Sequence, residues 1–191
     1  MEIATKTLKP YIFDDAATLE YQRLDLMSKI LDPWTRGYLT ALGVSQGWQC
    51  LELGSGNGSI AEWLSETVSP SGNVTAIDIN PVLLELIPAQ NLTVQQMDVR
   101  TGELRANAYD LITCRALLHQ IAEYGPAVLA RMPAAVKPGG WLLVQEAGRC
   151  TSGCSSLRCA IAWLTVAGST PRRSTPPQGH WKPRTAGRSA G

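Results

Sequence analysis

Short apolar runs alternate along this chain with segments that have a helical pattern. This alternation restricts the possible fold classes more than any other feature of the sequence. Five runs rich in Val, Ile and Leu have the length and composition of strands buried on both faces of a parallel sheet. Parallel strands must be joined by crossovers, and the segments between these runs have the apolar spacing of helices. The expected strands lie at 50–53, 74–77, 92–96, 111–114 and 141–144, and the expected helices between them at 60–68, 81–87 and 126–136. The sequence therefore predicts an α/β fold with a doubly wound, mainly parallel sheet of about five strands.

Residues 1–45 have the pattern of helices that precede the sheet. Apolar residues recur at the spacing of one helix face from Leu24 to Leu31. Asp32 and Pro33 then have the residue types of an N-cap and a first-turn proline, which predicts that a second, short helix begins here. We expect this N-terminal helical region to form a cap on the sheet.

Charge is distributed unevenly along the chain, and its character changes after residue 146. Residues 1–146 hold all 16 acidic residues against 10 basic ones, a net charge of −6. Residues 147–191 hold 7 basic residues and no acidic one, so their net charge is +7, and they are rich in Gly, Ser, Pro and Arg. We interpret 46–146 as the core domain and 147–191 as a basic low-complexity segment, either disordered or translated from a shifted reading frame. A functional basic arm is the remaining alternative, and only 160–167 could form a strand or a helix.

The composition favours an intracellular protein with reduced cysteines and a packed hydrophobic core. Apolar residues make up 45% of the chain and charged residues 17%, which suits a packed domain rather than a disordered polymer. The longest near-apolar stretch, 160–167, has eight residues, whereas a membrane helix needs about 20. Residues 1–10 lack the basic-then-apolar order of a signal peptide. The five cysteines do not have the spacing of zinc ligands, so we expect a cytoplasmic protein without a metal site.

A glycine-rich loop lies where the first expected strand meets the first expected helix. Residues 51–59 read Leu-Glu-Leu-Gly-Ser-Gly-Asn-Gly-Ser. Glycines at alternate positions let the backbone turn tightly and let a ligand approach without meeting a Cβ atom. The helix that follows presents unpaired N–H groups at its N-terminus. A loop of this kind is typical of nucleotide sites in α/β proteins.

Three details restrict the ligand of this loop. The dinucleotide fingerprint has glycine at its sixth position, where this chain has Ser59. Glu52 lies two residues before the first glycine, and a carboxylate there suits a cation and would repel a pyrophosphate. Asp78 ends the second expected strand, where an acidic side chain can accept hydrogen bonds from ribose hydroxyls. The loop therefore predicts a nucleoside ligand with a ribose and a positive group.

These residues, together with Asp98 and the Lys-Pro-Gly-Gly sequence at 137–140, resemble the class I S-adenosylmethionine-dependent methyltransferases that act on small molecules. The similarity covers about residues 20–146. It implies a Rossmann-like fold with S-adenosylmethionine as the cofactor. It also implies a small-molecule acceptor as the partner, with neither a membrane nor a nucleic acid involved.

The resemblance also implies roles for individual residues. Glu52 would lie near the methionine amino group, and Asp78 would hold the ribose hydroxyls, with Ile79 against the adenine. Asp98 would accept a hydrogen bond from the adenine amino group, and Arg115 would lie near the methionine part. The full set of implied cofactor-binding residues is Glu52, Gly54, Ser55, Gly56, Asn57, Gly58, Asp78, Ile79, Asp98, Val99, Cys114 and Arg115.

Each of the charged side chains also has a purely structural interpretation. Glu52 could pair with a basic residue of a helix, Asp78 could cap the helix expected at 81–87, and Asp98 could stabilise a turn. Arg115 could form a surface ion pair. His119 could be a catalytic base, although a packed helix residue is the simpler interpretation.

The sequence identifies no catalytic residue. Methyl transfer from a sulfonium releases a neutral thioether, so a base is needed only when the acceptor must lose a proton. Tyr21, Gln22 and Arg23 are candidates for covering the site from the N-terminal helical region.

Three other function classes stay open: a truncated protein that binds cofactor without catalysis, a nicotinamide-dependent oxidoreductase and a nucleic-acid binder that uses the basic segment. Glu52 and Ser59 argue against the oxidoreductase.

The chain departs from the family after the fifth expected strand. The Lys-Pro-Gly-Gly sequence predicts a turn that leads into that strand. Similar enzymes continue through another helix and two more strands, which residues 147–191 do not supply. We therefore expect the sheet to stop at its fifth strand and to leave a bare apolar edge.

Overall fold

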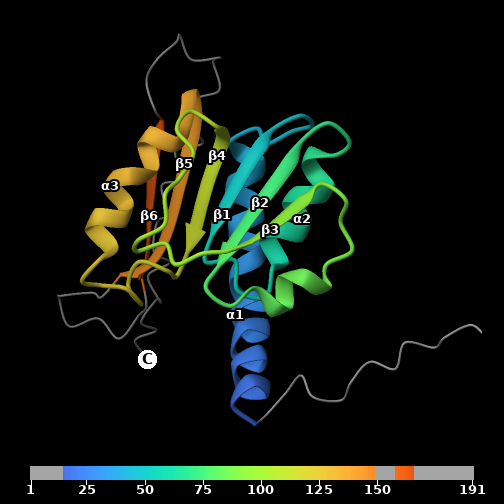
Figure 1. The fold of residues 1–191 in the computed structure, drawn as a ribbon, viewed down its shortest axis with the longest axis vertical. Coiled ribbons are helices and arrows are strands. Elements are labelled where there is room, and N and C mark those ends of the chain that lie inside the picture. The colour runs from blue at the N-terminus through green and yellow to red at the C-terminus, as the bar shows by residue number, and fades with distance from the viewer. Residues whose placement is uncertain (1–14, 149–157, 166–191) are drawn as a thin grey trace, which may run out of the picture.

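In the computed structural model, which describes residues 15–148 and 158–165, helices cover both faces of one six-stranded sheet (Figure 1). The strand order is β3-β2-β1-β4-β5-β6. The first five strands are mutually parallel, as the sequence predicts, and β6 is antiparallel to β5. The strands are β1 (Gln49–Leu53), β2 (Asn73–Asp78), β3 (Leu92–Gln96), β4 (Tyr109–Arg115), β5 (Val136–Gly148) and β6 (Arg158–Thr165).

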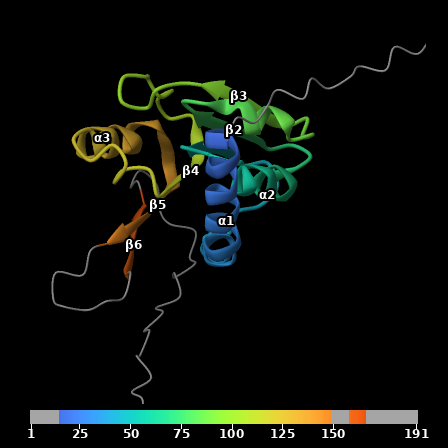
Figure 2. The same ribbon diagram turned by 90° about the horizontal axis from the view of Figure 1, so that it is seen from below.

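The helices form two layers on opposite faces of the sheet (Figure 2). On one face lie α1 (Asp15–Ala41), α2 (Ser59–Val68) and the 3₁₀ helix η1 (Pro81–Leu86), and on the other lies α3 (Gly125–Ala135). Cys50 and Leu111 pack against the first layer, whereas Leu51 and Ile112 pack with Val128 of α3. Adjacent residues of one strand thus enter different cores, because side chains alternate along a strand. This is why the expected strands are continuous apolar runs.

The N-terminal helical region is one helix rather than two. The helix α1 runs without a break through Pro33, which lies inside it. A proline there removes one backbone hydrogen bond, but packing of the buried residues of α1, such as Leu39, against the sheet holds the helix together. The carboxylate of Asp32 does not cap a new helix, because it accepts hydrogen bonds from Ser59 and Arg115 instead. In the part of the chain that the structure describes, no helix is long and apolar enough to cross a membrane.

The Lys-Pro-Gly-Gly sequence lies inside β5 and is not a turn that precedes it. Tyr109 of β4 pairs with Val136, whereas Leu111, two residues later, pairs with Trp141. The extra residues on β5 are accommodated as an irregularity of the β-bulge type. A Cβ atom at Gly140 would lie 2.8 Å from the carbonyl oxygen of Asp110, so only glycine fits this close approach of β4 and β5.

The outer edge of β5 is covered by a sixth strand, which corrects the expectation of a bare edge. β6 pairs with β5 from Trp141↔Thr165 to Gly148↔Arg158. It lies within the basic segment 147–191 and overlaps 160–167, the stretch for which the sequence allowed a strand or a helix. The rest of that segment beyond residue 165, like residues 1–14 and 149–157, lies outside the described residues. Its assignment as disordered or frame-shifted stays a prediction.

Two glycine substitutions should change stability in opposite directions. A Cβ atom at Gly72 would lie 2.5 Å from the Val68 Cβ and 2.6 Å from the Trp48 carbonyl oxygen, whereas one at Gly37 of α1 would meet nothing within 4 Å. We expect Gly72→Ala to lower the free energy of unfolding by about 1–3 kcal/mol. Gly37→Ala should raise it by about 0.5–1 kcal/mol, because alanine favours the helix. Urea denaturation of both variants measures the difference, and effects of the same sign would contradict this packing.

Candidate functional site

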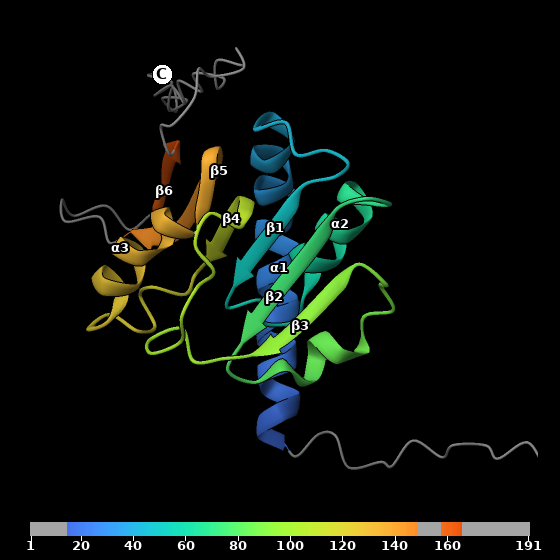
Figure 3. The ribbon, with the colours of Figure 1, turned by 45° about the horizontal axis from the view of Figure 1, so that its top comes forward.

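A cavity of about 570 Å³ lies at the carboxyl ends of the parallel strands. Its wall combines the loops after β1, β2, β3 and β4 with the N-terminal half of α1, which extends beyond the ends of these strands (Figures 1 and 3). β1 lies between β2 and β4, so the chain reverses its direction of strand addition here. Ligands of doubly wound folds bind at such switch points. All of the implied cofactor-binding residues except Gly58 and Cys114 line this one cavity.

The glycine-rich loop is folded back against the end of β2. The backbone N–H groups of Gly54 and Ser55 donate to the Ile77 carbonyl oxygen, at 2.8 and 3.1 Å. Gly54 and Gly56 have φ angles of 69° and 57°, in the left-handed region that favours glycine. The loop therefore lies with its backbone along the cavity, and no side chain at these two positions fills the space.

Glu52 is a buried carboxylate in the wall of this cavity. The residue is 4% exposed, and its Oε2 atom has no hydrogen-bond partner. Burial raises the pKa of Glu52 to about 8, although the positive charge of Arg115 opposes the shift. A buried carboxylate oxygen without a donor is costly, so the free Oε2 atom suits a ligand that brings a cationic donor. Glu52 does not form a structural ion pair with a helix residue, because no described basic residue lies within ion-pair distance of it.

Asp78 is held at the tip of β2 by two backbone groups. Its Oδ2 atom accepts from the Gly56 N–H at 2.8 Å, and its Oδ1 atom accepts from the Asn80 N–H at 2.9 Å. A carboxylate has about four lone-pair positions, so it can still accept from ligand hydroxyls. Next to it Ile79, which is 60% exposed, presents an apolar surface to the cavity. Asp78 thus orders the glycine-rich loop and faces the cavity at the same time.

Asp98 forms an ion pair with Arg100, two residues further along the chain. The Arg100 guanidinium donates to both carboxylate oxygens at 2.6–3.0 Å, and its cation lies 5.6 Å from the centre of the Tyr124 ring. Hydrogen bonds from the Arg100 side chain and backbone lower the pKa of Asp98 to about 2. The adjacent Val99 lines the cavity, and its carbonyl oxygen accepts from Arg131 at 2.6 Å. Both oxygens of Asp98 are therefore already paired with Arg100.

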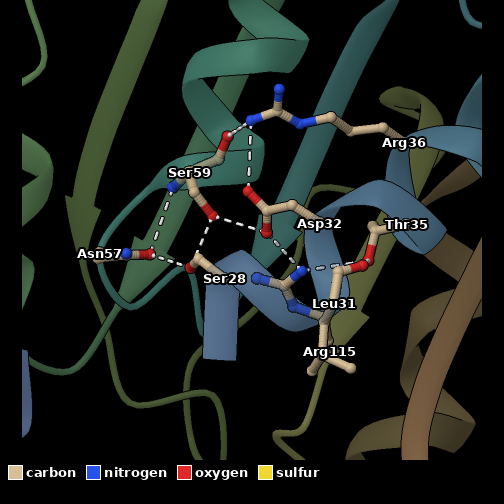
Figure 4. A network of polar contacts seen from close by, with 8 residues as sticks. All are labelled: Ser28, Leu31, Asp32, Thr35, Arg36, Asn57, Ser59 and Arg115. Carbon is tan, nitrogen blue, oxygen red and sulfur yellow. Dashed lines mark hydrogen bonds and ion pairs between the residues drawn. The ribbon is translucent and has the colours of Figure 1, made fainter. Parts of the chain in front are cut away.

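Arg115 belongs to a polar network that ties α1 to the glycine-rich loop and to β4 (Figure 4). Its Nη1 atom donates to Asp32 Oδ1 at 2.8 Å and to Thr35 Oγ1 at 3.1 Å. The Ser59 hydroxyl donates to the same Asp32 oxygen at 3.1 Å, and the Ser28 hydroxyl donates to Asn57 Oδ1 at 3.0 Å. The side chains of Arg115 and Asp32 are each only 13% exposed, so this is not a surface ion pair.

Gly58 and Cys114 lie outside the cavity wall. Gly58 precedes α2 and packs beside Ile87 and Leu84, where a Cβ atom would not fit. Cys114 is fully buried in the core on the α3 side of the sheet. Burial raises the pKa of its thiol. Cys114 and Arg115 are neighbours in β4, so only one of the two can face the cavity.

His119 lies in a turn and not in a packed helix. Its Nδ1 atom is 2.7 Å from Glu146 Oε2, its side chain is about half exposed, and it does not line the cavity. Glu146 also accepts from the backbone N–H groups of Leu117 and Leu118, at 3.0 and 2.7 Å. The pair therefore fixes the loop that follows β4, and this loop supplies Leu117 and Ile121 to the cavity.

Several cavity residues carry no motif in the sequence. Tyr21 and Arg23 line the cavity, as expected for candidates that cover the site, but Gln22 does not. No sequence pattern assigned to the cavity the residues that α1 and the loops after β3 and β4 add to its wall, which include Leu24, Met27, Ser28, Arg100, Leu117, Gln120 and Ile121. The helical spacing of Leu24 and Met27 indicated a buried face, but not that the face lies over a ligand cavity.

Known proteins with similar sequences are methyltransferases. The chain is 32% identical over 138 residues to methyltransferase str2 of Strobilurus tenacellus, covering 72% of this chain and 49% of that protein. It is 29% identical over 137 residues to the ubiquinone/menaquinone biosynthesis C-methyltransferase UbiE of Psychromonas ingrahamii, covering 65% and 54%. The chain thus spans about half the length of the curated relatives it matches.

Solved structures share the fold at lower identity. A SAM-dependent methyltransferase from Aquifex aeolicus superposes with a TM-score of 0.58 at 22% identity, covering 74% of this chain and 78% of that one. The [4+2]-cyclase SpnF superposes with a TM-score of 0.57 at 18% identity, covering 66% and 49%. Residues 50–140 match the family described as a methyltransferase domain. This match, the similar sequences and the shared fold together support the class I S-adenosylmethionine-dependent methyltransferase superfamily for this chain.

Proposed function

We propose that the cavity binds S-adenosylmethionine and that the protein transfers its methyl group to a small-molecule acceptor. The observation that carries this proposal is the buried, unpartnered Oε2 atom of Glu52 in the cavity wall. The amino group of S-adenosylmethionine is a cationic donor of the kind that this atom lacks. The methyltransferase relatives, one of which is named for quinone biosynthesis, support a small-molecule acceptor.

The residues of the cavity wall fit the parts of this cofactor. Glu52 would bind the amino group, Asp78 the ribose hydroxyls, and Ile79 would lie against the adenine. Asp98, with Arg100 attached, would accept from the adenine amino group. The backbone of Gly54–Gly58 would run beside the methionine part. A dinucleotide fits less well, because the Glu52 carboxylate would repel a pyrophosphate placed along this loop.

The protein's contribution to the reaction is chiefly one of position. Bound S-adenosylmethionine supplies an activated methyl group on sulfur, whose departure leaves a neutral thioether. Tyr21, Leu24 and Met27 of α1, with Leu117 and Ile121 beyond β4, would exclude water and hold the acceptor in line with the methyl group. Holding two reactants in line can lower a barrier by about 7–11 kcal/mol. This supports methyl transfer without a dedicated base, provided that the acceptor is already nucleophilic.

Binding of S-adenosylhomocysteine should depend on pH through Glu52. The pKa of Glu52 is about 8 in the ligand-free protein, so below this pH the carboxyl group must lose its proton before it can bind an ammonium group. We expect the dissociation constant to fall about tenfold per pH unit up to pH 8 and then to level off. Calorimetric titration in buffers of different ionisation enthalpy measures both the affinity and the released proton.

Two controls accompany this titration. Glu52→Gln keeps the size of the side chain but should bind weakly and without the pH dependence. NAD should bind to neither protein. A folded wild-type protein that fails to bind S-adenosylhomocysteine, or that binds NAD as tightly, would refute the proposed function.

The Glu52→Gln variant should also be more stable than the wild type in alkaline solution. The folded-state pKa of Glu52, about 8, is above its ordinary value of 4.5, so the folded state holds this proton more tightly than the unfolded state. The wild-type free energy of unfolding should therefore fall by up to about 1.4 kcal/mol per pH unit between these values. The variant should lack this contribution. Denaturation curves of both proteins at several pH values test this prediction. If the free energies of unfolding of the two proteins change with pH in parallel, the titrating group is not Glu52.

Loss of the Asp78 carboxylate should weaken cofactor binding. We expect Asp78→Ala to raise the dissociation constant for S-adenosylhomocysteine by about tenfold or more, because two charge-assisted hydrogen bonds to the ribose would be lost. Asp110→Ala is a matched control, since Asp110 forms an ion pair with Lys137 at the opposite end of the sheet. If both variants bind equally well, Asp78 does not contact the ligand.

A further inference from the structure

We propose that Asp32 is a positioning residue that holds Arg115 away from Glu52, so that the Glu52 carboxylate remains available to the cationic group of the cofactor. This inference rests on the proposed function and adds a role for α1 to it. It starts from the fact that a buried carboxylate with an unpartnered oxygen has an arginine nearby.

Glu52 and Arg115 lie on the same face of the sheet. Glu52 pairs in register with Thr113 of the neighbouring strand β4, and Arg115 is two residues further along. Side chains two residues apart on a strand share a face, so Arg115 projects on the Glu52 side. The arginine side chain is long enough to span this diagonal, yet the structure has no hydrogen bond or ion pair between the two groups.

Arg115 is instead directed to α1 (Figure 4). Its guanidinium donates to Asp32 at 2.8 Å and to the hydroxyl of Thr35 at 3.1 Å, in a setting where the Arg115 and Asp32 side chains are 13% exposed. Asp32 is itself held by the Ser59 hydroxyl and by Arg36, at 3.1 and 3.3 Å. Two carboxylates therefore compete for one guanidinium, and the geometry favours Asp32.

Whether Arg115 pairs with Asp32 or with Glu52 determines what a cationic ligand must displace. If Arg115 were paired with Glu52, an incoming ammonium group would have to break a buried ion pair before it could bind. With Arg115 paired to Asp32, the ammonium group only has to replace the proton on Glu52. The groups that face Glu52 are Arg115 of β4, Asp32 of α1, the hydroxyl of Ser55 and the backbone of Ala61 in α2. Arg115 is the only cation among them.

The test compares Asp32→Asn with Arg115→Gln in the full chain. The titration of the Glu52 carboxyl carbon is followed by NMR without ligand, assigned by its absence in Glu52→Gln, and S-adenosylhomocysteine affinity is measured across the same pH range. Asp32→Asn should release Arg115 to Glu52, lower the titration midpoint by about one pH unit or more and weaken the plateau affinity about tenfold. Arg115→Gln should move the midpoint upwards.

A merely structural role for Asp32 predicts a different result. Loss of the Asp32 charge would by itself lower the midpoint, so the double variant Asp32→Asn/Arg115→Gln separates the two effects. If Asp32 acts through Arg115, Asp32→Asn should lower the midpoint much less when Arg115 is already replaced. Asp110→Asn, which neutralises an ion-paired aspartate at the other end of β4, should leave the midpoint unchanged. Unchanged or parallel midpoints in Asp32→Asn and Arg115→Gln would overturn the inference. If Asp32→Asn does not fold, Thr35→Val replaces it, because it removes the second acceptor of Arg115 without a change of charge. A midpoint that Thr35→Val does not lower would then overturn the inference.

The two proposals can fail separately. The ligand-free titration tests the effect of Asp32 on Glu52 even if no ligand binds. A wild-type protein that does not bind S-adenosylhomocysteine would refute the proposed function, and with it the stated purpose of the Asp32–Arg115 pair. Wild-type binding with an affinity that Asp32→Asn leaves unaltered would refute only the role of Asp32.

Discussion

Burial of the Glu52 carboxylate is the constraint around which the site is organised. The sheet removes this side chain from water, and no described side chain neutralises it. Arg115, whose charge acts on Glu52, donates to Asp32 and Thr35 of α1 instead, and the glycine-rich loop beside Glu52 offers backbone in place of side chains. A protein selected for stability alone would pair or replace such a group. Its retention in a cavity wall is typical of a site in which the ligand completes the electrostatics.

Features that depend on neighbouring residues in the chain could be predicted from the sequence. The five parallel strands follow from apolar runs, and the loop at 51–59 follows from its glycine spacing and its place after a strand. Asp78 and Glu52 could be placed at the carboxyl edge of the sheet because parallel strands end together there. Their positions in one cavity agree with this expectation.

Features that depend on distant parts of the chain could not be predicted. Asp32 meets Arg115 across 83 residues of sequence, and the local pattern of Asp followed by Pro is the same for an N-cap and for this buried ion pair. Glycines at 139–140 mark a turn or a bulge equally well, and only the register with β4 distinguishes the two. β6 similarly depends on the free edge of β5, which is a property of the assembled sheet.

Pro33 lies inside the continuous helix α1, and the parts of the helix before and after it have different contacts. Beyond Pro33, Leu39 is anchored in the core, whereas before it the residues from Glu20 to Ser28 cover the cavity. Proline has no N–H to donate, so the carbonyl of Lys29 lacks its usual helical partner and the helix resists bending least at this turn. Bending there is opposed by the hydrogen bonds that Ser28 and Asp32, which precede the proline, make with Asn57 and Ser59. The same polar contacts therefore do two things: they hold the cavity wall in place, and they compensate for the backbone hydrogen bond that the proline removes from the helix.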